Sequence, residues 1–144
     1  MTDTENKIAI IGAGPIGTGI AHIGLAAGFN MVLIDQAQEA LTKASSELTE
    51  AMARKLTQGQ IDQAEYDARL GRLSHGADFS LVKSAGTVIE SVSEIEDVKR
   101  TIYKSIRDHL SPDTLLATTT SSVSITRLAA SSDRPHRFIG MHFM

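Results

Sequence analysis

The chain has 144 residues, enough for one domain with its own core. Its residues are 42% apolar and 22% charged, which excludes the disordered and fibrous classes and is typical of a cytoplasmic globular protein. A formal charge of −3 predicts no general attraction to nucleic acid or to an anionic membrane surface. Since there is no cysteine, disulfides, thiol catalysis and cysteine-ligated metals are excluded, and we expect no metal site.

Residues 8–34 form a stretch without formal charge that is long enough to raise the possibility of a membrane span or signal segment. Six glycines and Pro15 interrupt it, and the preceding leader holds Asp3 and Glu5 instead of a basic cluster. We therefore expect no membrane segment and interpret the stretch as strand, turn, helix and strand.

The first of these elements is a buried strand at 7–11, where Ile occupies three of five positions and glycine follows. A helix follows, and Gly28 ends it before a second strand at 31–34. The apolar stripe of that helix is predicted to contain Ile16, Ile20 and Ile23.

Residues 38–57 predict one long amphipathic helix, because apolar residues recur every three or four positions. After a Gln-Gly-Gln break, Asp62 followed by Glu65 is typical of the start of a second helix. We expect a helical hairpin over about 38–72, inserted before a short extended segment at 73–77. The buried stripe of its first helix is predicted to be Leu41, Ala44, Leu48, Met52 and Leu56.

The rest of the chain alternates between the two kinds of element. The predicted strands are 87–92, 114–118 and 137–143, and the predicted helices are 98–110, with Val98, Ile102, Ile106 and Leu110 inward, and 125–130. This alternation predicts a single α/β domain over 1–144: a Rossmann-type, doubly wound, mainly parallel sheet with helices on both faces.

The segment 12–17 reads Gly-Ala-Gly-Pro-Ile-Gly and fits the pattern Gly-x-Gly-x-x-Gly. The pattern is weak alone, but here it follows a strand and opens a helix, so helix amides and the positive end of the helix dipole would face a pyrophosphate. The alternative is that these glycines serve only a tight turn. The candidate cofactor-binding residues are Gly12, Gly14, Pro15, Ile16 and Gly17.

Asp35 ends the second predicted strand, 18 residues after Gly17, where an acid can accept hydrogen bonds from adenosine ribose hydroxyls. A carboxylate about 4 Å from a 2′-phosphate would repel it by about 4 kcal/mol at an effective dielectric near 20. No Lys or Arg follows before Lys43 to offset this repulsion. The sequence therefore predicts NAD as cofactor and excludes NADP; the alternative is that Asp35 only caps the next helix.

Three polar residues stand where later strands finish, at the edge where ligands bind in open α/β sheets: Glu94, Ser121 and His142. A histidine suits the proton transfer that accompanies hydride transfer at a carbon bearing oxygen, and a serine hydroxyl can hold the substrate oxygen. His142 and Ser121 are therefore the candidate catalytic residues. A purely structural histidine is the alternative for His142.

Six stretches carry a resemblance to a known family. They are IAIIGAGPIGTGIA at 8–21, VLIDQ at 32–36, KLTQGQID at 55–62, VIESVSEIEDVK at 88–99, TSSVSI at 120–125 and RFIGMHF at 137–143. Together they resemble the amino-terminal, NAD-binding half of the L-3-hydroxyacyl-CoA dehydrogenase family, from about Lys7 to the last residue. The 21 residues between Ser121 and His142 match the spacing between that family's Thr-Ser-Ser serine and its catalytic histidine.

The resemblance implies a role for each matching residue. Asp35 and Gln36 would hold the adenosine ribose, and Glu94 and Lys99 would line the nicotinamide side. Ser121 would contact substrate and nicotinamide, and His142 would be the general acid/base that interconverts L-3-hydroxyacyl-CoA and 3-ketoacyl-CoA.

The sequence also departs from the family pattern. Arg54 and Lys55 are the obvious basic groups of the hairpin, with Ala51 and Gln58 where a hydroxyl and a lysine are expected for the coenzyme A tail, and Thr119 replaces an asparagine. The family's chain continues to a glutamate that orients the histidine and to a helical substrate and dimerisation domain. We expect that domain to be missing here and the chain alone to be poorly active.

Three interpretations of function remain open at this point. The first is the NAD-binding half of a 3-hydroxyacyl-CoA dehydrogenase, with an acyl-CoA substrate for the complete enzyme and a role in fatty-acid metabolism. The second is a stand-alone NAD-binding or split-enzyme module. The third is a related dehydrogenase of a non-CoA hydroxy acid. We expect association with a second copy or with a helical domain, and no nucleic-acid or membrane partner.

Overall fold

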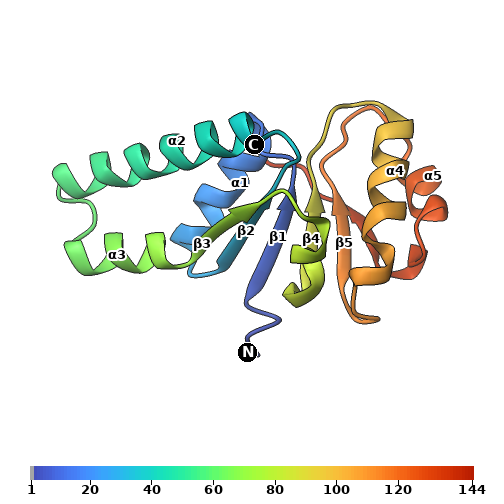
Figure 1. The fold of residues 1–144 in the computed structure, drawn as a ribbon, viewed down its shortest axis with the longest axis horizontal. Helices are drawn as coiled ribbons and strands as arrows, with labels where there is room; N and C mark the ends of the chain where they lie inside the picture. Colours follow the sequence, from blue (N-terminus) through green and yellow to red (C-terminus); the bar gives the residue numbers. More distant parts are fainter. Residues whose placement is uncertain (1) are drawn as a thin grey trace.

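The computed structural model describes residues 2–144 and is built on one parallel sheet of six strands (Figure 1). The strand order is β3-β2-β1-β4-β5-β6, with β1 and β4 at the centre. This order confirms the predicted Rossmann-type fold. The strands are β1 (Lys7–Ile11), β2 (Asn30–Ile34), β3 (Leu73–Gly76), β4 (Thr87–Glu90), β5 (Leu115–Thr118) and β6 (Phe138–Gly140).

Helices cover both faces of the sheet, so apolar residues on both faces of β1 are buried. Alternate residues of β1 enter different cores: Ile10 packs into one cluster, and Ala9 and Ile11 pack into the other. The first core lies under helices α1 (Pro15–Ala26) and α2 (Gln38–Thr57). The second lies under α4 (Glu96–Ile106), α5 (Ile125–Ser131) and the 3₁₀ segment η1 (Phe79–Ser84).

The predicted hairpin is present as α2 followed by α3 (Gln63–Gly71), and Figure 1 shows it projecting sideways beyond the sheet. Leu41, Ala44, Leu48 and Met52 are buried as predicted, whereas Leu56, beyond them toward the tip, is only half-buried. Asp62 caps α3 by accepting a hydrogen bond from the Glu65 amide at 2.8 Å. Two further 3₁₀ segments are η2 (Arg107–His109) and η3 (Pro135–Arg137).

The predicted inward face of α1 was right at Ile20, which is 4% exposed, and wrong at Ile16 and Ile23, which are 56% and 54% exposed. The buried face also contains Leu25 and several small residues. A Cβ at Gly24 would lie 2.3 Å from the sulfur of Met31, so glycine lets this helix approach β2 closely. Close backbone approach at the small residues therefore helps to decide which face is buried.

The predicted face of α4 needs a similar correction. Ile106 is buried as predicted, but the other buried residues are Lys99 and Tyr103. The predicted Val98, Ile102 and Leu110 are only half-buried. The strands predicted at 87–92 and 137–143 are shorter, ending at Glu90 and Gly140, because the chain leaves the sheet there to form loops at the carboxyl edge. None of the helices in residues 2–144 combines the length and hydropathy needed to span a bilayer.

Candidate functional site

The glycine turn, residues 12–17, connects β1 to α1 in a conformation that requires two of its glycines. Gly12 has φ +110°, and a Cβ there would lie 2.3 Å from the Ser91 carbonyl oxygen. A Cβ at Gly17 would lie 1.9 Å from the Gly12 carbonyl oxygen. The turn therefore packs directly against the end of β4 and against its own helix, as the glycine pattern predicts.

Gly14, the middle glycine of the turn, has a different environment. Gly14 is the N-cap of α1, no side chain caps the helix there, and a Cβ would meet nothing within 4 Å. The first-turn amides have no intrahelical partner, and Pro15 at the first helical position fixes the backbone. An open helix N-terminus that backbone alone forms fits the pyrophosphate of a dinucleotide.

Asp35 joins the end of β2 to the glycine turn. One carboxylate oxygen accepts the Ala13 amide and the other accepts the Ala37 amide, both at 2.9 Å. Ala37, not Asp35, is the N-cap residue of α2, and Asp35 accepts the amide of that residue. Asp35 is half-buried, and its remaining lone pairs are available to hydroxyls in the adjoining groove.

A groove of about 370 Å³ runs along the carboxyl edge of the sheet between β2, β1 and β4. Gly12, Gly14, Asp35 and Gln36 form one side, and residues 91–93 form the other. Its apolar lining consists of Ile11, Ile34, Phe79, Val92, Val98 and Ile102. The groove thus offers an apolar surface for an aromatic base beside an acid for a ribose and amides for phosphates.

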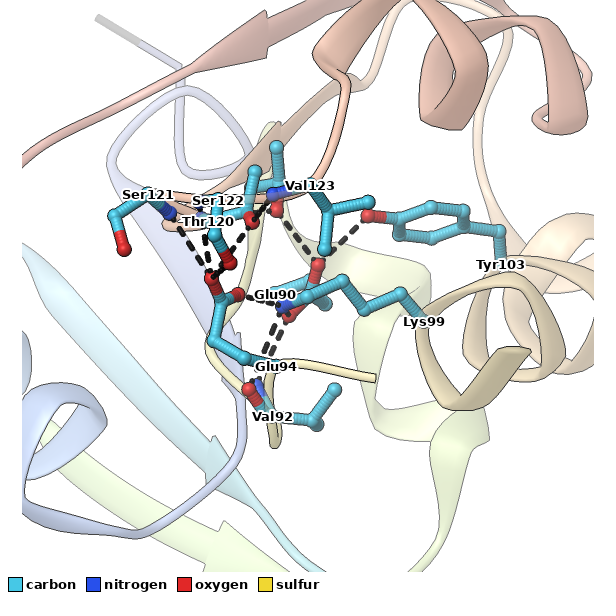
Figure 2. A network of polar contacts seen from close by, with 10 residues as sticks. Glu90, Val92, Glu94, Lys99, Tyr103, Thr120, Ser121, Ser122 and Val123 are labelled. Carbon is cyan, nitrogen blue, oxygen red and sulfur yellow. Dashed lines mark hydrogen bonds and ion pairs between the residues drawn. The ribbon is translucent and has the colours of Figure 1, made fainter. Parts of the chain in front are cut away.

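Glu94 lies beyond the groove, in the loop after β4, and holds the Ser121 loop, residues 119–123 (Figure 2). Its Oε2 accepts four hydrogen bonds from that loop: the Thr120 hydroxyl at 3.0 Å, the Ser121 and Ser122 amides at 3.2 Å each, and the Ser122 hydroxyl at 2.7 Å. Its Oε1 lies 3.1 Å from the Lys99 ammonium.

These contacts set the charge state of Glu94. Partial burial raises the pKa of this carboxyl, but hydrogen bonds from Ser122, Thr120, Lys99 and the Ser121 amide outweigh it and lower the pKa to about 2. Glu94 is therefore a carboxylate at neutral pH, and within residues 2–144 its one ionic partner is the buried Lys99.

Behind Glu94 lies the Glu90 cluster, which consists of Glu90, Lys99, Tyr103 and Thr118, all buried. Glu90 accepts from Lys99, from the Tyr103 hydroxyl and from the Thr118 hydroxyl, each at 2.7 Å, and from the Val92 amide at 3.0 Å. Burial and the Glu90 carboxylate raise the pKa of Tyr103, so its hydroxyl keeps its proton and donates it.

Sequence reasoning missed Glu90, Tyr103 and Thr118 as parts of this site. The available signal was an acid at the end of an otherwise apolar strand, followed nine residues later by a lysine. The helical pattern concealed it, because Val98 and Ile102 stand directly before Lys99 and Tyr103 and suggested the wrong inward face.

The predicted catalytic residues lie beyond the ends of β5 and β6. The Met141 amide donates to the Thr118 carbonyl at 2.9 Å, and the strand register pairs Thr118, three residues before Ser121, with Gly140, two residues before His142. His142 is exposed, while its neighbours Met141 and Phe143 pack on the core. In Figure 2 no dashed line reaches the Ser121 hydroxyl, and this hydroxyl makes no hydrogen bond within residues 2–144.

The structure thus brings the predicted residues together in two groups. Gly12, Gly14, Asp35 and Gln36 line the groove, with Pro15, Ile16 and Gly17 completing the adjacent turn. Glu94, Lys99 and Ser121 form the second group through direct contacts. His142 follows β6 at the same edge and makes no side-chain hydrogen bond within residues 2–144.

The strand order, the glycine turn and the acid after β2 define a dinucleotide-binding domain of the Rossmann type. A family model described as "3-hydroxyacyl-CoA dehydrogenase, NAD binding domain" matches residues 7–144. The chain belongs to this family, as the sequence resemblance predicted, and the family's cofactor is NAD.

Individual relatives agree with this assignment. A 3-hydroxybutyryl-CoA dehydrogenase of Bradyrhizobium diazoefficiens is 38% identical over all of this chain and 49% of the relative. A 3-hydroxyadipyl-CoA dehydrogenase of Escherichia coli is 35% identical over 99% of this chain and 30% of its own length. The crystal structure of (S)-3-hydroxybutyryl-CoA dehydrogenase from Ralstonia eutropha superposes with a TM-score of 0.92 at 33% identity, covering 97% of this chain and 50% of that one. The chain therefore spans about half the length of such relatives or less.

Proposed function

We propose that this chain is the NAD-binding half of an enzyme that interconverts L-3-hydroxyacyl-CoA and 3-ketoacyl-CoA. The observation that carries the proposal is that one edge of the sheet holds both the groove and, beyond β5 and β6, Ser121 and His142. NAD supplies a hydride acceptor when it is bound, so the residues of the chain need only bind, orient and move one proton.

The glycine turn and the acid after β2 would bind the adenosine half of the cofactor. Amides at the start of α1, around Gly14, Ile16 and Gly17, would hold the pyrophosphate, with Gly12 and Pro15 shaping the turn. Asp35 and Gln36 would accept and donate hydrogen bonds at the ribose.

The second group would act at the reacting end. In oxidation, the C3 hydrogen leaves as hydride and the hydroxyl proton passes to the His142 imidazole. The free Ser121 hydroxyl would hold the substrate oxygen in line, and Glu94 with Lys99 would support the nicotinamide side. In ketone reduction His142 returns the proton to the oxygen.

Acyl-CoA is the proposed substrate class because the matched relatives are named for CoA thioesters. A non-CoA hydroxy acid is the second candidate, favoured by the hairpin surface, where Arg54 is accompanied by Glu50, Thr57 and Gln58 around one shallow depression. A cytoplasmic location stays a prediction. Association with a helical domain or a second copy also stays a prediction, and the exposed side chains of Ile125 on α5 and Ile139 on β6 supply apolar surface for it.

The direct test joins this chain to the remaining half of the Bradyrhizobium enzyme and follows NADH oxidation with acetoacetyl-CoA. We expect turnover, and a loss of at least about a hundredfold in the His142→Gln variant, because general acid–base catalysis contributes that much. A folded chimera that binds NADH but reduces a free keto acid and no acyl-CoA would select the second candidate. Equal rates for the chimera and its His142→Gln variant would contradict the assigned role of His142.

A further inference from the structure

The Glu90 cluster lies too deep to touch a substrate or cofactor. Glu90 and Lys99 have no exposed side-chain surface, and Tyr103 is 3% exposed. The Lys99 ammonium has three N–H donors, and three oxygens surround it: Glu90 Oε2 at 2.7 Å, Glu94 Oε1 at 3.1 Å and the Val92 carbonyl at 3.4 Å. No donor of Lys99 is left for a bound molecule.

The cluster connects the rigid core to the Ser121 loop in a fixed order. Glu90 comes from β4, Thr118 from β5, and Lys99 and Tyr103 from α4, so three elements determine where the ammonium lies. The ammonium then holds Glu94, and Glu94 Oε2 holds the amides of Ser121 and Ser122 (Figure 2).

Stability alone is a weak reason for such a cluster. Two carboxylates and one ammonium leave a net charge of −1, and burying ions costs solvation free energy that apolar residues of similar volume would not lose. What apolar residues could not supply is direction: hydrogen bonds of fixed geometry that orient an exposed loop from within the core.

We propose that Glu90 and Tyr103 are positioning residues for Ser121, acting through Lys99 and Glu94. Building on the proposed function, this inference assigns Lys99 to positioning Glu94 and not to contacting the cofactor. The backbone that carries the Ser121 hydroxyl is thereby held in place before any substrate arrives.

Tyr103 makes two contacts that can be separated by substitution. Its hydroxyl donates to Glu90, while its ring packs edge-on against Phe138 of β6, with centroids 5.4 Å apart and planes at 83°. Tyr103→Phe removes only the first contact, and Phe138→Leu removes only the second. Tyr66→Phe is the matched control, because Tyr66 packs against the other core and its hydroxyl has no hydrogen bond within the described residues.

The experiment measures amide hydrogen exchange by NMR in the ligand-free chain and its variants. Tyr103→Phe should speed exchange of the Ser121 and Ser122 amides at least about fivefold while amides of β1 and β2 keep their protection. Tyr66→Phe and Phe138→Leu should leave those two loop amides unchanged. Unchanged loop exchange in a folded Tyr103→Phe variant would overturn the proposal, and so would uniform acceleration throughout the sheet, which is the mark of a merely structural role.

A second variant covers the case in which Tyr103→Phe does not fold. Glu90→Gln is isosteric, but it replaces one carboxylate oxygen, which accepts two hydrogen bonds, with an NH2 group that can only donate. Two of the four donors around this position then lose their acceptor, so hydrogen exchange at the Ser121 and Ser122 amides should speed up. Preserved protection in this variant would equally overturn the proposal. NADH titration of the unsubstituted chain tests the proposed function separately, because the exchange measurement needs no ligand.

Discussion

The two ends of the site are built in different ways. The glycine turn is made from backbone, and consecutive residues determine its shape. The Ser121 loop is held by side chains that three separate elements bring together across the core. A backbone site depends on space at particular Cα atoms, whereas the side-chain site depends on charge balance in a buried cluster, so substitutions should affect the two ends differently.

The largest effect should come from removing the buried cation. Lys99→Met leaves the Glu90 carboxylate buried without its charged partner, which costs about 3–5 kcal/mol of unfolding free energy. Urea denaturation measures the loss. Lys43→Met is the control, since the Lys43 side chain is 78% exposed and its contact with Glu47 is long, at 3.8 Å. Equal stability of the two variants would show that the cluster is not the tightly coupled unit described above.

Next in size is the response of the glycine turn to added methyl groups. Gly17→Ala would push a Cβ onto a backbone oxygen and should cost about 2–3 kcal/mol of unfolding free energy, because a backbone neighbour cannot move aside cheaply.

Gly14→Ala has open space around it and should change the unfolding free energy by less than about 1 kcal/mol. Its NADH affinity should nevertheless fall at least about tenfold, because the methyl group occupies the approach to the phosphates. Denaturation and NADH fluorescence together separate these effects, and a Gly14→Ala variant with unchanged NADH affinity would contradict the assigned phosphate position.

Much of the backbone end could be predicted from sequence, because local patterns encode it. Gly12, Gly17 and Asp35 occupy fixed positions after strands, and the structure places them as expected. The inward faces of α1 and α4 were predicted correctly at Ile20 and Ile106 but not at the other positions, because apolar periodicity ranks side chains by hydrophobicity. It cannot register a glycine that allows close packing, as at Gly24, or a lysine whose charge is balanced inside the core.

The smallest expected effect is the pH dependence of the side-chain end. The pKa of Glu94 is lowered to about 2, so its contribution to stability is fully present above the unfolded value of about 4.5 and is lost as pH falls through 2. Its side chain is 42% exposed, so solvent screening reduces that contribution to about 1 kcal/mol. The Glu94→Gln variant should therefore be less stable than the unsubstituted chain at pH 5, and this difference in unfolding free energy should shrink as the pH drops to about 3. Urea denaturation at each pH measures the difference. A deficit that widens toward low pH would reverse the assigned sign.

The central claim, that the glycine turn and Asp35 form a working NAD site, is tested most directly by titrating NADH and then NADPH into the purified chain and following nucleotide fluorescence. The account predicts saturable NADH binding with NADPH at least about tenfold weaker, because the Asp35 carboxylate repels a 2′-phosphate. Equal binding of the two nucleotides, or binding of neither, would contradict it.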